Sequence, residues 1–387
     1  MKRLTILFTT DQYTPTINGI VSHIVILREE LQKRGHRVII VAPKLKKQKK
    51  EKDVYYLPAF PLKFRAKDQF TIPFDSKIEK KILSLPIDIV HNHLFLTGYF
   101  GMRIAEKKQI SIIATFHTFL RQYVDWIAPW AKSITHPVAN LVGRDYFKEH
   151  ALILAPSLKA KEELSKMRIK TPIELLHNGI DIQLFQKASS IDFTKKFFID
   201  TQRPLVIITG ILEQGKNVAL AIRSIQKLKK TVPNIQLVII GDGKKRKSLE
   251  ALIYKLGLAR NVFITGFLDR KLIASANKAA NVVLFTSDTD NFPTVIIEAL
   301  ASGKPIVAVK DKAVTELIEH NKNGFLASKN PTSIAACLEK ILVDKKLTKS
   351  FGQNSFQKSK QLSITSYVDL LEKVYEQILQ KKDIIKL

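Results

Sequence analysis

The stretch Ser287–Val309, SDTDNFPTVIIEALASGKPIVAV, is the most informative part of the chain. It sets two acids, Asp290 and Glu298, on either side of the start of one predicted helix. Pro293 suits a first helical turn, where no backbone N–H is needed, and Gly303 supplies the usual stop. The sequence therefore predicts a short and well bounded helix that carries a carboxylate.

This helix has two different faces. At 100° per residue, Thr294, Glu298 and Ser302 share one stripe. The apolar residues of the opposite side are Ile296, Ile297 and Leu300. Residues 281–287, NVVLFTS, read as a buried strand, so Asp290 and the helix N-terminus are expected at the carboxyl end of a sheet, where open α/β folds bind ligands. Free N–H groups at that end suit an anion such as a diphosphate.

Length and composition describe an ordinary globular protein with an unusual charge. The 387 residues favour two α/β domains, each large enough for a core of its own. No apolar run approaches the length of a membrane span, and the opening MKRLTILFTTDQY is better interpreted as a first strand than as a signal peptide. Cys337 is the single cysteine, which excludes an internal disulfide and fits a reducing compartment.

The net charge of +28 favours anionic partners such as nucleotide substrates, acidic lipid headgroups or nucleic acid. The sequence contains no zinc-finger spacing, RNP-type aromatic pattern or basic zipper, so nucleic-acid binding would rest on charge alone and is not expected. Cys and His residues with metal-ligand spacing are also absent, and no metal site is predicted. The lysine-rich run at 44–50, KLKKQKK, fits a solvated loop or a contact with a membrane surface.

Short β-rich runs alternate with helical stretches along the whole chain, a pattern that predicts parallel sheets with crossover helices. The first series of strands reads LTILFT, RVIIVA, DIVHNH, SIIATF, ALILAPS and IELLHNG. The second series reads LVIITG, QLVIIGDG, NVFITG, NVVLFTS, PIVAV and GFLAS. The irregular text at 189–204 is interpreted as the linker. The fold class is therefore α/β, with two Rossmann-like domains that face each other across a cleft.

The segment around Asp290 resembles the signature of retaining GT-B glycosyltransferases of the group 1 and family 4 type. In that family an acid is followed by Phe-Gly or a close variant and then by Glu-Ala-(Met/Leu)-Ala-x-Gly-x-Pro. Here the segment reads Asp290, Asn291-Phe292-Pro293 and then Glu298-Ala299-Leu300-Ala301-Ser302-Gly303-Lys304-Pro305. The chain departs from the family by having Asp at 290, where Glu is usual.

The resemblance covers residues 4–327 and implies a domain plan. Residues 1–185 would form an N-terminal acceptor-binding domain, completed by a C-terminal helix at 360–387 that crosses back to it. Residues 200–355 would form the domain that binds the nucleotide sugar.

Two motifs of the first domain match the family in order. Asn18 and Gly19 stand where the family usually has a pair of glycines at the start of a helix, and their backbone would let a phosphate approach closely. The run SIIATFHTF places His117 after a buried strand. A lone histidine is more often structural, but many retaining GT-B enzymes have Thr-x-His-Thr here, and that histidine contacts the donor sugar near the reacting carbon.

The second domain carries the remaining motifs of the family. Lys216 matches the lysine that grips the donor diphosphate, but Ile211 stands where the family has an arginine for the same task. Gly241 and Gly243 form a tight turn, which the fold alone could also require. The loop Gly266, Phe267 and Leu268 resembles the one that binds the nucleotide base.

The resemblance implies transfer of a hexose from a nucleotide diphosphate sugar to a hydroxyl acceptor, with retained anomeric configuration and without a metal. Asp290 would hold hydroxyls of the sugar, Glu298 the ribose hydroxyls and Lys216 the diphosphate. The segment at 291–294 would face sugar and diphosphate with the backbone N–H groups of its non-proline residues; its residues are Asn291, Phe292, Pro293 and Thr294. No cofactor is expected besides the donor, for which UDP and glucose are favoured.

The acceptor is predicted from the segment 121–151, which combines tryptophans with basic residues, a composition common at membrane interfaces. The residues assigned to acceptor or membrane are Arg121, Tyr123, Trp126, Trp130 and Lys132. The arrangement resembles bacterial enzymes that glycosylate diacylglycerol. We therefore expect a cytoplasmic enzyme, peripheral at the inner face of the cell membrane, with a lipid acceptor and an anionic membrane surface as partners. An ordinary packed helix pair would give the same pattern.

Two other functions remain open. One is a transferase that acts on a soluble sugar or a polysaccharide. The other is a degenerate GT-B domain that binds polyanions without turnover, which Ile211 favours. The sequence leaves the oligomeric state undetermined.

Overall fold

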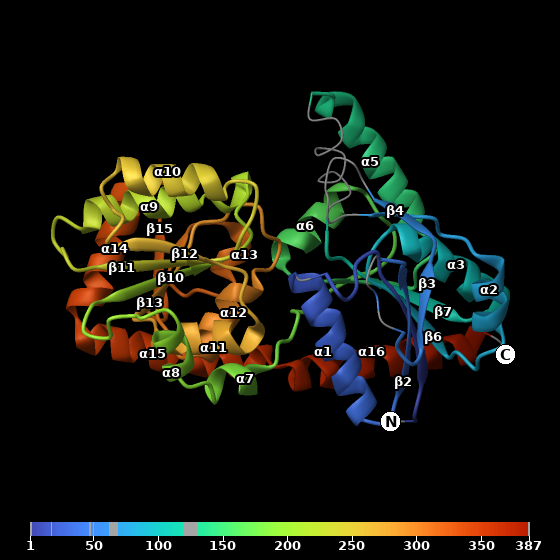
Figure 1. Cartoon of the computed structure of the whole chain (residues 1–387). Helices are drawn as coiled ribbons and strands as arrows, with labels where there is room; N and C mark the ends of the chain where they lie inside the picture. Colours follow the sequence, from blue (N-terminus) through green and yellow to red (C-terminus); the bar gives the residue numbers. More distant parts are fainter. Residues whose placement is uncertain are drawn as a thin grey trace. The chain divides into compact units, whose positions relative to one another are not determined.

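The fold was analysed on a computed structural model (Figure 1), which describes residues 2–16, 18–45, 48, 50–61, 69–118 and 130–385. The chain divides into two compact units. Unit 1 contains Met1–Gly179 and Ile364–Leu387, and unit 2 contains Ile180–Ser363. Each unit is built around its own parallel sheet, so the predicted α/β class with two Rossmann-like halves is confirmed.

Unit 1 contains a seven-stranded sheet in the order β3-β2-β1-β6-β7-β8-β9. Its strands are β1 (Thr5–Thr9), β2 (Arg37–Pro43), β3 (Val54–Leu57), β6 (Ile89–Asn92), β7 (Ser111–Thr115), β8 (Leu152–Ala155) and β9 (Ile173–Leu175). The neighbours β1 and β6 are parallel, with Phe8 opposite His91. The strand order reverses between β1 and β6, and such a switch point at the carboxyl ends of strands is where open α/β sheets bind ligands.

Helices and one small hairpin complete unit 1. The helices are α1 (Gly19–Lys33), α2 (Ser76–Leu83), α3 (Leu96–Lys108), α5 (Lys132–Phe147) and α6 (Leu158–Lys166), and the hairpin pairs β4 (Ala59–Pro61) with β5 (Gln69–Thr71).

The C-terminal helix α16 (Ile364–Ile385) belongs to unit 1, as the sequence predicted. Its apolar face, including Val368 and Leu371, is buried in the same core as Ile24 and Leu27 of α1. Arg34 at the end of α1 adds ion pairs to the acids of α16.

Unit 2 contains a six-stranded parallel sheet in the order β12-β11-β10-β13-β14-β15. Its strands are β10 (Leu205–Thr209), β11 (Gln236–Ile240), β12 (Val262–Gly266), β13 (Val282–Phe285), β14 (Ile306–Val309) and β15 (Gly324–Ala327). Successive side chains point to opposite faces, so Val206 and Ile208 pack on one side while Leu205 and Ile207 pack on the other. Both faces are apolar, as expected for parallel strands covered by helices.

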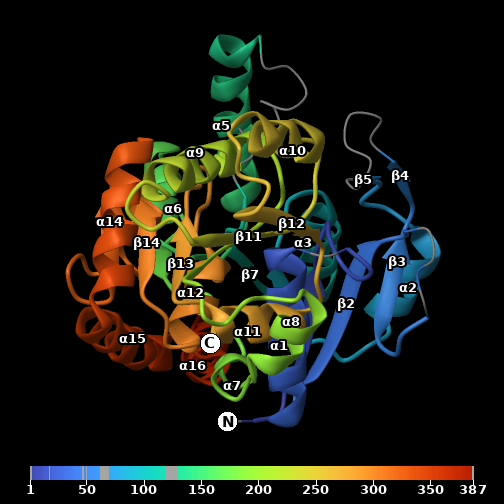
Figure 2. The same ribbon diagram turned by 60° about the vertical axis from the view of Figure 1, so that its left-hand side comes forward.

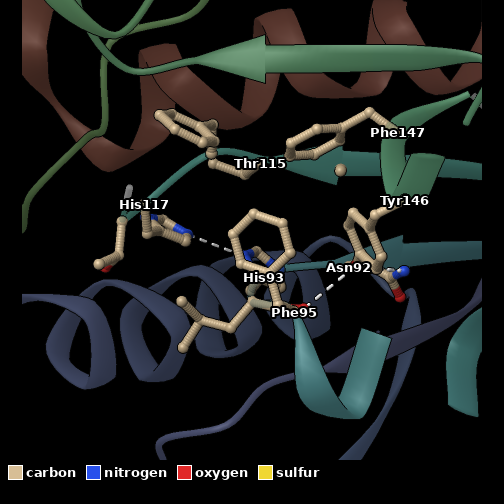
Figure 3. A pocket seen from close by; sticks show the side chains of 11 residues that line it. Asn92, His93, Phe95, Thr115, His117, Tyr146 and Phe147 are labelled. Atoms are coloured by element: carbon tan, nitrogen blue, oxygen red, sulfur yellow. Dashed lines mark hydrogen bonds between the residues drawn. The ribbon is translucent and has the colours of Figure 1, made fainter. Parts of the chain in front are cut away.

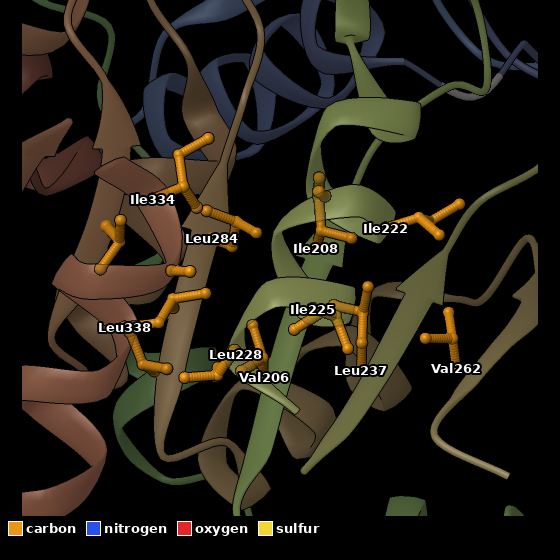
Figure 4. Packing of buried hydrophobic residues seen from close by; sticks show 14 of the residues in the cluster. Val206, Ile208, Ile222, Ile225, Leu228, Leu237, Val262, Leu284, Ile334 and Leu338 are labelled. Carbon is orange, nitrogen blue, oxygen red and sulfur yellow. The ribbon is translucent and has the colours of Figure 1, made fainter. Parts of the chain in front are cut away.

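The first face is covered by α9 (Val218–Leu228), α10 (Arg246–Lys255) and α14 (Pro331–Val343). Figure 4 shows residues of α9 and α14 packed against the strands. Below the sheet in Figure 2 lie α7 (Ile182–Gln186), α8 (Ile191–Lys196), α11 (Arg270–Ala279) and α12 (Thr294–Ala301). The remaining elements are the 3₁₀ turns η1 (Gln214–Lys216) and η2 (Lys360–Leu362) and the helices α13 (Lys312–Thr315) and α15 (Lys345–Ser359).

The prediction of a linker at 189–204 is wrong. This stretch contains α8, and Phe193 is fully buried in the core of unit 2. The ring of Phe197 lies 5.1 Å from that of Phe193, because residues four apart share one helix face. Such a short helix shows no clear hydrophobic periodicity, which is why this stretch of the sequence looked irregular.

Candidate active site

In unit 2 the loop after β10 is tied to the loop after β13 by hydrogen bonds. The Thr286 hydroxyl donates to the Lys216 carbonyl at 2.7 Å, and the Asn217 amide donates to the Thr286 carbonyl at 3.2 Å. Asn217 adopts the left-handed conformation, with φ of 52°, between η1 and α9. Because β10 and β13 are neighbours, these links hold both loops at one edge of the sheet.

Those two loops bring together two residues that the sequence singled out. The Lys216 ammonium donates to both carboxylate oxygens of Asp290, at 2.6 and 2.8 Å. The side chains are 29% and 25% exposed, so the pair is reachable from solvent. The cation predicted to bind a diphosphate and the acid predicted to bind the sugar therefore contact each other directly.

The helix that follows Asp290 behaves as its pattern predicted. It begins at Thr294 with Pro293 as N-cap, and Pro293 makes no side-chain cap hydrogen bond. Ile296, Ile297 and Leu300 are fully buried, while on the other stripe Thr294 and Glu298 are partly exposed and Ser302 is buried. The N–H groups at the start of a helix such as α12 point in the direction that suits an anion.

Glu298 lies on the partly exposed stripe of α12. Removal from water raises the pKa of its carboxyl group to about 7, and the nearby positive charge of Arg270 opposes that shift. Glu298 therefore titrates near neutral pH.

The glycines of the predicted turn after β11 have a structural task. Gly241 has φ of 143°, and a Cβ atom there would lie 1.9 Å from the carbonyl oxygen of Gly210. A Cβ atom at Gly243 would lie 2.6 Å from the Leu212 carbonyl oxygen. The loops touch directly, as the hydrogen bond from Leu212 N–H to the Asp242 carbonyl at 3.0 Å also shows. These positions need glycine for loop packing, whether or not a ligand binds nearby.

The predicted base-binding loop follows β12. Gly266 ends that strand with φ of 81°, and the Phe267 side chain is 45% exposed while Leu268 packs partly into the core. Ile211, at the position of the missing arginine, is 36% exposed.

In unit 1, Asn18 caps α1. Its side-chain oxygen accepts from Val21 N–H at 2.9 Å, and its amide donates to Gln12 at 2.6 Å. Gly19 is the exposed first residue of the helix. Asn18 therefore itself satisfies part of the helix N-terminus that the sequence assigned to a phosphate.

His117 follows β7 and is half-buried beside a small pocket (Figure 3). Its Nε2 lies 3.1 Å from Nδ1 of His93, which follows the neighbouring strand β6. Burial holds the pKa of both imidazoles well below the ordinary value. The pocket is lined mainly by the last residues of the two strands, by the residues just after them and by α5: Asn92, His93, Phe95, Thr115, His117, Tyr146 and Phe147.

Sequence reasoning missed two residues at this edge of unit 1. The sequence reasoning placed His93 inside the strand DIVHNH. His93 in fact follows β6, which pairs with β7, the strand before His117, and this position could have identified it. Asp11 follows β1, and its carboxylate accepts from Leu96 N–H at 2.9 Å and Thr97 N–H at 2.6 Å. Burial raises the pKa of Asp11 against these hydrogen bonds.

Of the residues assigned to acceptor or membrane, Arg121, Tyr123 and Trp126 lie outside the described residues. Trp130 is 87% exposed just before α5, and Lys132 is the first residue of α5. A feature that the sequence did not predict is an apolar strip on α5. It consists of Val138, Leu141 and Val142, which are 54%, 56% and 40% exposed.

None of the described helices is both long enough and apolar enough to cross a bilayer.

Comparison with known proteins matches almost the whole chain to two families. Residues 17–184 match "Glycosyltransferase Family 4" and residues 190–358 match "Glycosyl transferases group 1". An alpha-monoglucosyldiacylglycerol synthase of Acholeplasma laidlawii is 23% identical over 97% of both chains. A protein of the same name from Streptococcus pneumoniae is 25% identical, over 86% of this chain and 77% of that protein.

Solved structures share the fold. Sucrose-phosphate synthase of Thermosynechococcus elongatus superimposes with a TM-score of 0.81 at 18% identity, covering 98% of this chain and all of that one, 100%. Anabaena HepE, solved in complex with UDP and glucose, gives a TM-score of 0.79 at 18% identity, covering 97% of this chain and 100% of that chain.

Proposed function

The chain belongs to the GT-B glycosyltransferases, and on that premise we propose that it transfers a hexose from a nucleotide diphosphate sugar to the hydroxyl group of a membrane lipid such as diacylglycerol. The transfer would retain the anomeric configuration and need no metal. The observation that carries this proposal is the contact between Lys216 and Asp290 in front of the α12 N-terminus, with Glu298 on the same helix.

The donor roles follow from the chemistry of these groups. Lys216 stabilises the negative charge that grows on the departing diphosphate, together with the backbone N–H groups of Asn291, Phe292 and Thr294. Asp290 accepts hydrogen bonds from sugar hydroxyls and Glu298 from the ribose diol, since an ionised carboxylate can accept from two donors. His117 contacts the donor sugar near the reacting carbon. When the donor binds, Lys216 is shared between Asp290 and the phosphate.

Front-face attack gives retention with these groups. The bond between the anomeric carbon and the phosphate oxygen breaks while the acceptor oxygen bonds to the same face of that carbon. The acceptor proton passes to the departing phosphate oxygen, so no protein nucleophile is required. HepE, solved with UDP-glucose, supports a nucleotide-sugar donor of this class.

The lipid acceptor is supported by the two diacylglycerol-named relatives and by unit 1 itself. The strip of Val138, Leu141 and Val142 on α5 is exposed next to Arg144, which is also exposed. An apolar strip with adjacent cations fits an interface rich in anionic lipid. The net charge of +28 agrees with such a surface, at the inner face of the cell membrane.

Activity is tested with a panel of UDP- and GDP-sugars and diacylglycerol in anionic vesicles, comparing wild type with Glu298→Ala. We expect a glycolipid product from the wild type that persists in EDTA, a coupling constant at the new anomeric proton that matches the donor, and strong loss in the variant. Transfer to soluble sugars in the absence of vesicles would contradict the lipid acceptor. No turnover combined with no nucleotide binding would contradict the enzyme.

Membrane association is tested by vesicle flotation. Wild type should bind anionic vesicles more strongly than zwitterionic ones, and salt should weaken the binding. Leu141→Asp should reduce it several-fold, while Val343→Asp, at a position of unit 2 that is 71% exposed, should not. Equal loss in both variants, or equal binding to both lipids, would contradict the role of α5.

A second function is favoured by one observation. Ile211 is 36% exposed where the family has arginine, which points to a domain that binds polyanions without turnover. Salt-sensitive heparin binding in a protein without transfer or hydrolysis of any donor would support it.

A further inference from the structure

We propose that His93 is a positioning residue that donates a hydrogen bond from Nδ1 to Nε2 of His117 and thereby fixes the tautomer of His117 with its proton on Nδ1. This inference deepens the proposed glycosyl transfer and rests on it for the role of His117. It concerns which atom of His117 carries the proton, which decides whether that ring meets a sugar hydroxyl as donor or as acceptor.

The two rings belong to a histidine column, which consists of the nearly parallel rings of His91, His93 and His117. The His91 and His93 rings lie 4.3 Å apart at 25°, and the His93 and His117 rings lie 5.4 Å apart at 19°. Phe8 packs edge-on against His93, with ring centroids 4.6 Å apart. His91 and Phe8 therefore pack against the His93 ring and hold it in one orientation, while His117 lies beside the ring, where Nδ1 of His93 contacts its Nε2 at 3.1 Å (Figure 3).

The direction of the hydrogen bond follows from the other nitrogen of His93. This residue is fully buried, and its Nε2 has no hydrogen-bond partner within the described ranges of the chain. A buried N–H without an acceptor is rare because it loses its hydration entirely. The proton of neutral His93 therefore belongs on Nδ1, where an acceptor stands at 3.1 Å. His117 must then accept through Nε2 and carry its own proton on Nδ1.

Both rings are neutral. One of the two facing nitrogens, Nδ1 of His93 and Nε2 of His117, therefore carries a proton, and the other accepts the hydrogen bond. Burial and the neighbouring imidazoles hold the pKa of His93 and His117 well below the ordinary value. Among the described residues, the histidines form no group that could hold a metal ion. The stack therefore acts through the direction of its hydrogen bonds and not through charge.

The other two histidines have different tasks. His91 is committed on both sides, because Nδ1 lies 2.8 Å from the Tyr375 hydroxyl and Nε2 lies 2.7 Å from the Thr115 hydroxyl. His23 meets the His117 ring edge-on at 5.6 Å and places its Nδ1 3.4 Å from the Gly179 carbonyl. His93 differs from both, because its Nδ1 lies within hydrogen-bond distance of His117.

The first test reads the tautomer directly. In protein labelled with ¹⁵N-histidine, long-range ¹H–¹⁵N spectra distinguish Nδ1–H from Nε2–H, and His117→Gln identifies the His117 signals. We expect Nδ1–H for His117 in the wild type, and a change to Nε2–H, or to a mixture, in His93→Phe. Nε2–H in the wild type would overturn the inference even if His93→Phe failed to fold.

The second test uses a matched pair of variants. His93→Asn keeps an N–H donor close to the position of Nδ1, and His93→Phe keeps a ring but no donor. We expect kcat to fall roughly tenfold or more in His93→Phe and to recover most of this loss in His93→Asn, with the KM for the lipid acceptor unchanged. Equal losses in both variants would mean a packing role only.

The two proposals fail in different ways. A wild type that transfers no sugar while showing Nδ1–H at His117, shifted by His93→Phe, contradicts the proposed function and supports the positioning of His117. A wild type that transfers sugar with Nε2–H at His117 contradicts the positioning and leaves the function intact.

Discussion

The ion pair of unit 2 and the histidine column of unit 1 are two opposite ways to prepare polar groups for a ligand. Lys216 and Asp290 are oppositely charged and about one quarter exposed, and each holds the other until a ligand competes. His93 and His117 are neutral because burial disfavours their charged forms. We therefore expect the first region to respond to anions and salt, and the second to respond to loss of a hydrogen-bond donor.

The largest effect should come from breaking the charged region. Lys216→Met removes the cation and leaves Asp290 without that partner, so kcat should fall by about 10²- to 10³-fold, the usual effect of removing one preorganised donor to a developing oxyanion. The measurement is the initial rate of sugar transfer at saturating donor. Lys227→Met, at an exposed position of α9, serves as the control. A loss of less than threefold in Lys216→Met would show that the cation does not serve the leaving group.

The contact of Lys216 with Asp290 is where sequence reasoning went furthest and still fell short. Both residues could be placed at carboxyl ends of strands from the text alone, and β10 and β13 are indeed neighbours. Their mutual hydrogen bonds were not predicted, because each was assigned to a ligand and the sequence does not show which charge satisfies which. The buried apolar stripe of α12 was predicted correctly, because the spacing of its apolar residues follows the helical period of 3.6 residues.

The histidine column could not be predicted in the same way. His93 looked like one more residue of a buried strand, and its task depends on a ring from a strand that follows later in the chain. At Phe193 a buried residue was mistaken for part of a linker. One buried aromatic in a short helix leaves no periodic pattern in the sequence. Local patterns identify elements, while side-chain pairs between elements need the fold.

A smaller effect should come from a change of pH, to which Glu298 of unit 2 and the histidines of unit 1 should respond differently. Glu298 has a raised pKa of about 7. In the proposed function the ribose diol donates hydrogen bonds to its ionised form. Below pH 7 the carboxyl must lose a proton to bind, so donor affinity should fall up to about tenfold per pH unit as the pH drops, and it should level off above pH 7. Burial holds the pKa values of His93 and His117 well below the ordinary value, so they should titrate at lower pH than Glu298.

The measurement is calorimetric titration with UDP-glucose between pH 5.5 and 8.5, because the diphosphate of this donor has no group that titrates near pH 7. Glu298→Gln should give a flat profile at the affinity that the wild type shows at low pH. A profile that keeps its inflection near pH 7 in Glu298→Gln would assign the titration to another group.

The smallest effect should come from restoring the missing arginine. Ile211 follows β10 at the same edge of the sheet as Lys216, and its side chain is 36% exposed, so an arginine can be placed there without opening the core. Because Lys216 already supplies one cation, Ile211→Arg should raise kcat/KM for the donor only about three- to tenfold, through a bidentate contact with phosphate. Ile211→Lys, which adds a point charge without the fork geometry, should gain less. Ile211→Leu should leave the rate unchanged. A loss of activity in Ile211→Arg would mean that the charged region of unit 2 needs no second cation. Isoleucine at 211 would then suit the donor that this protein uses and would not be a defect.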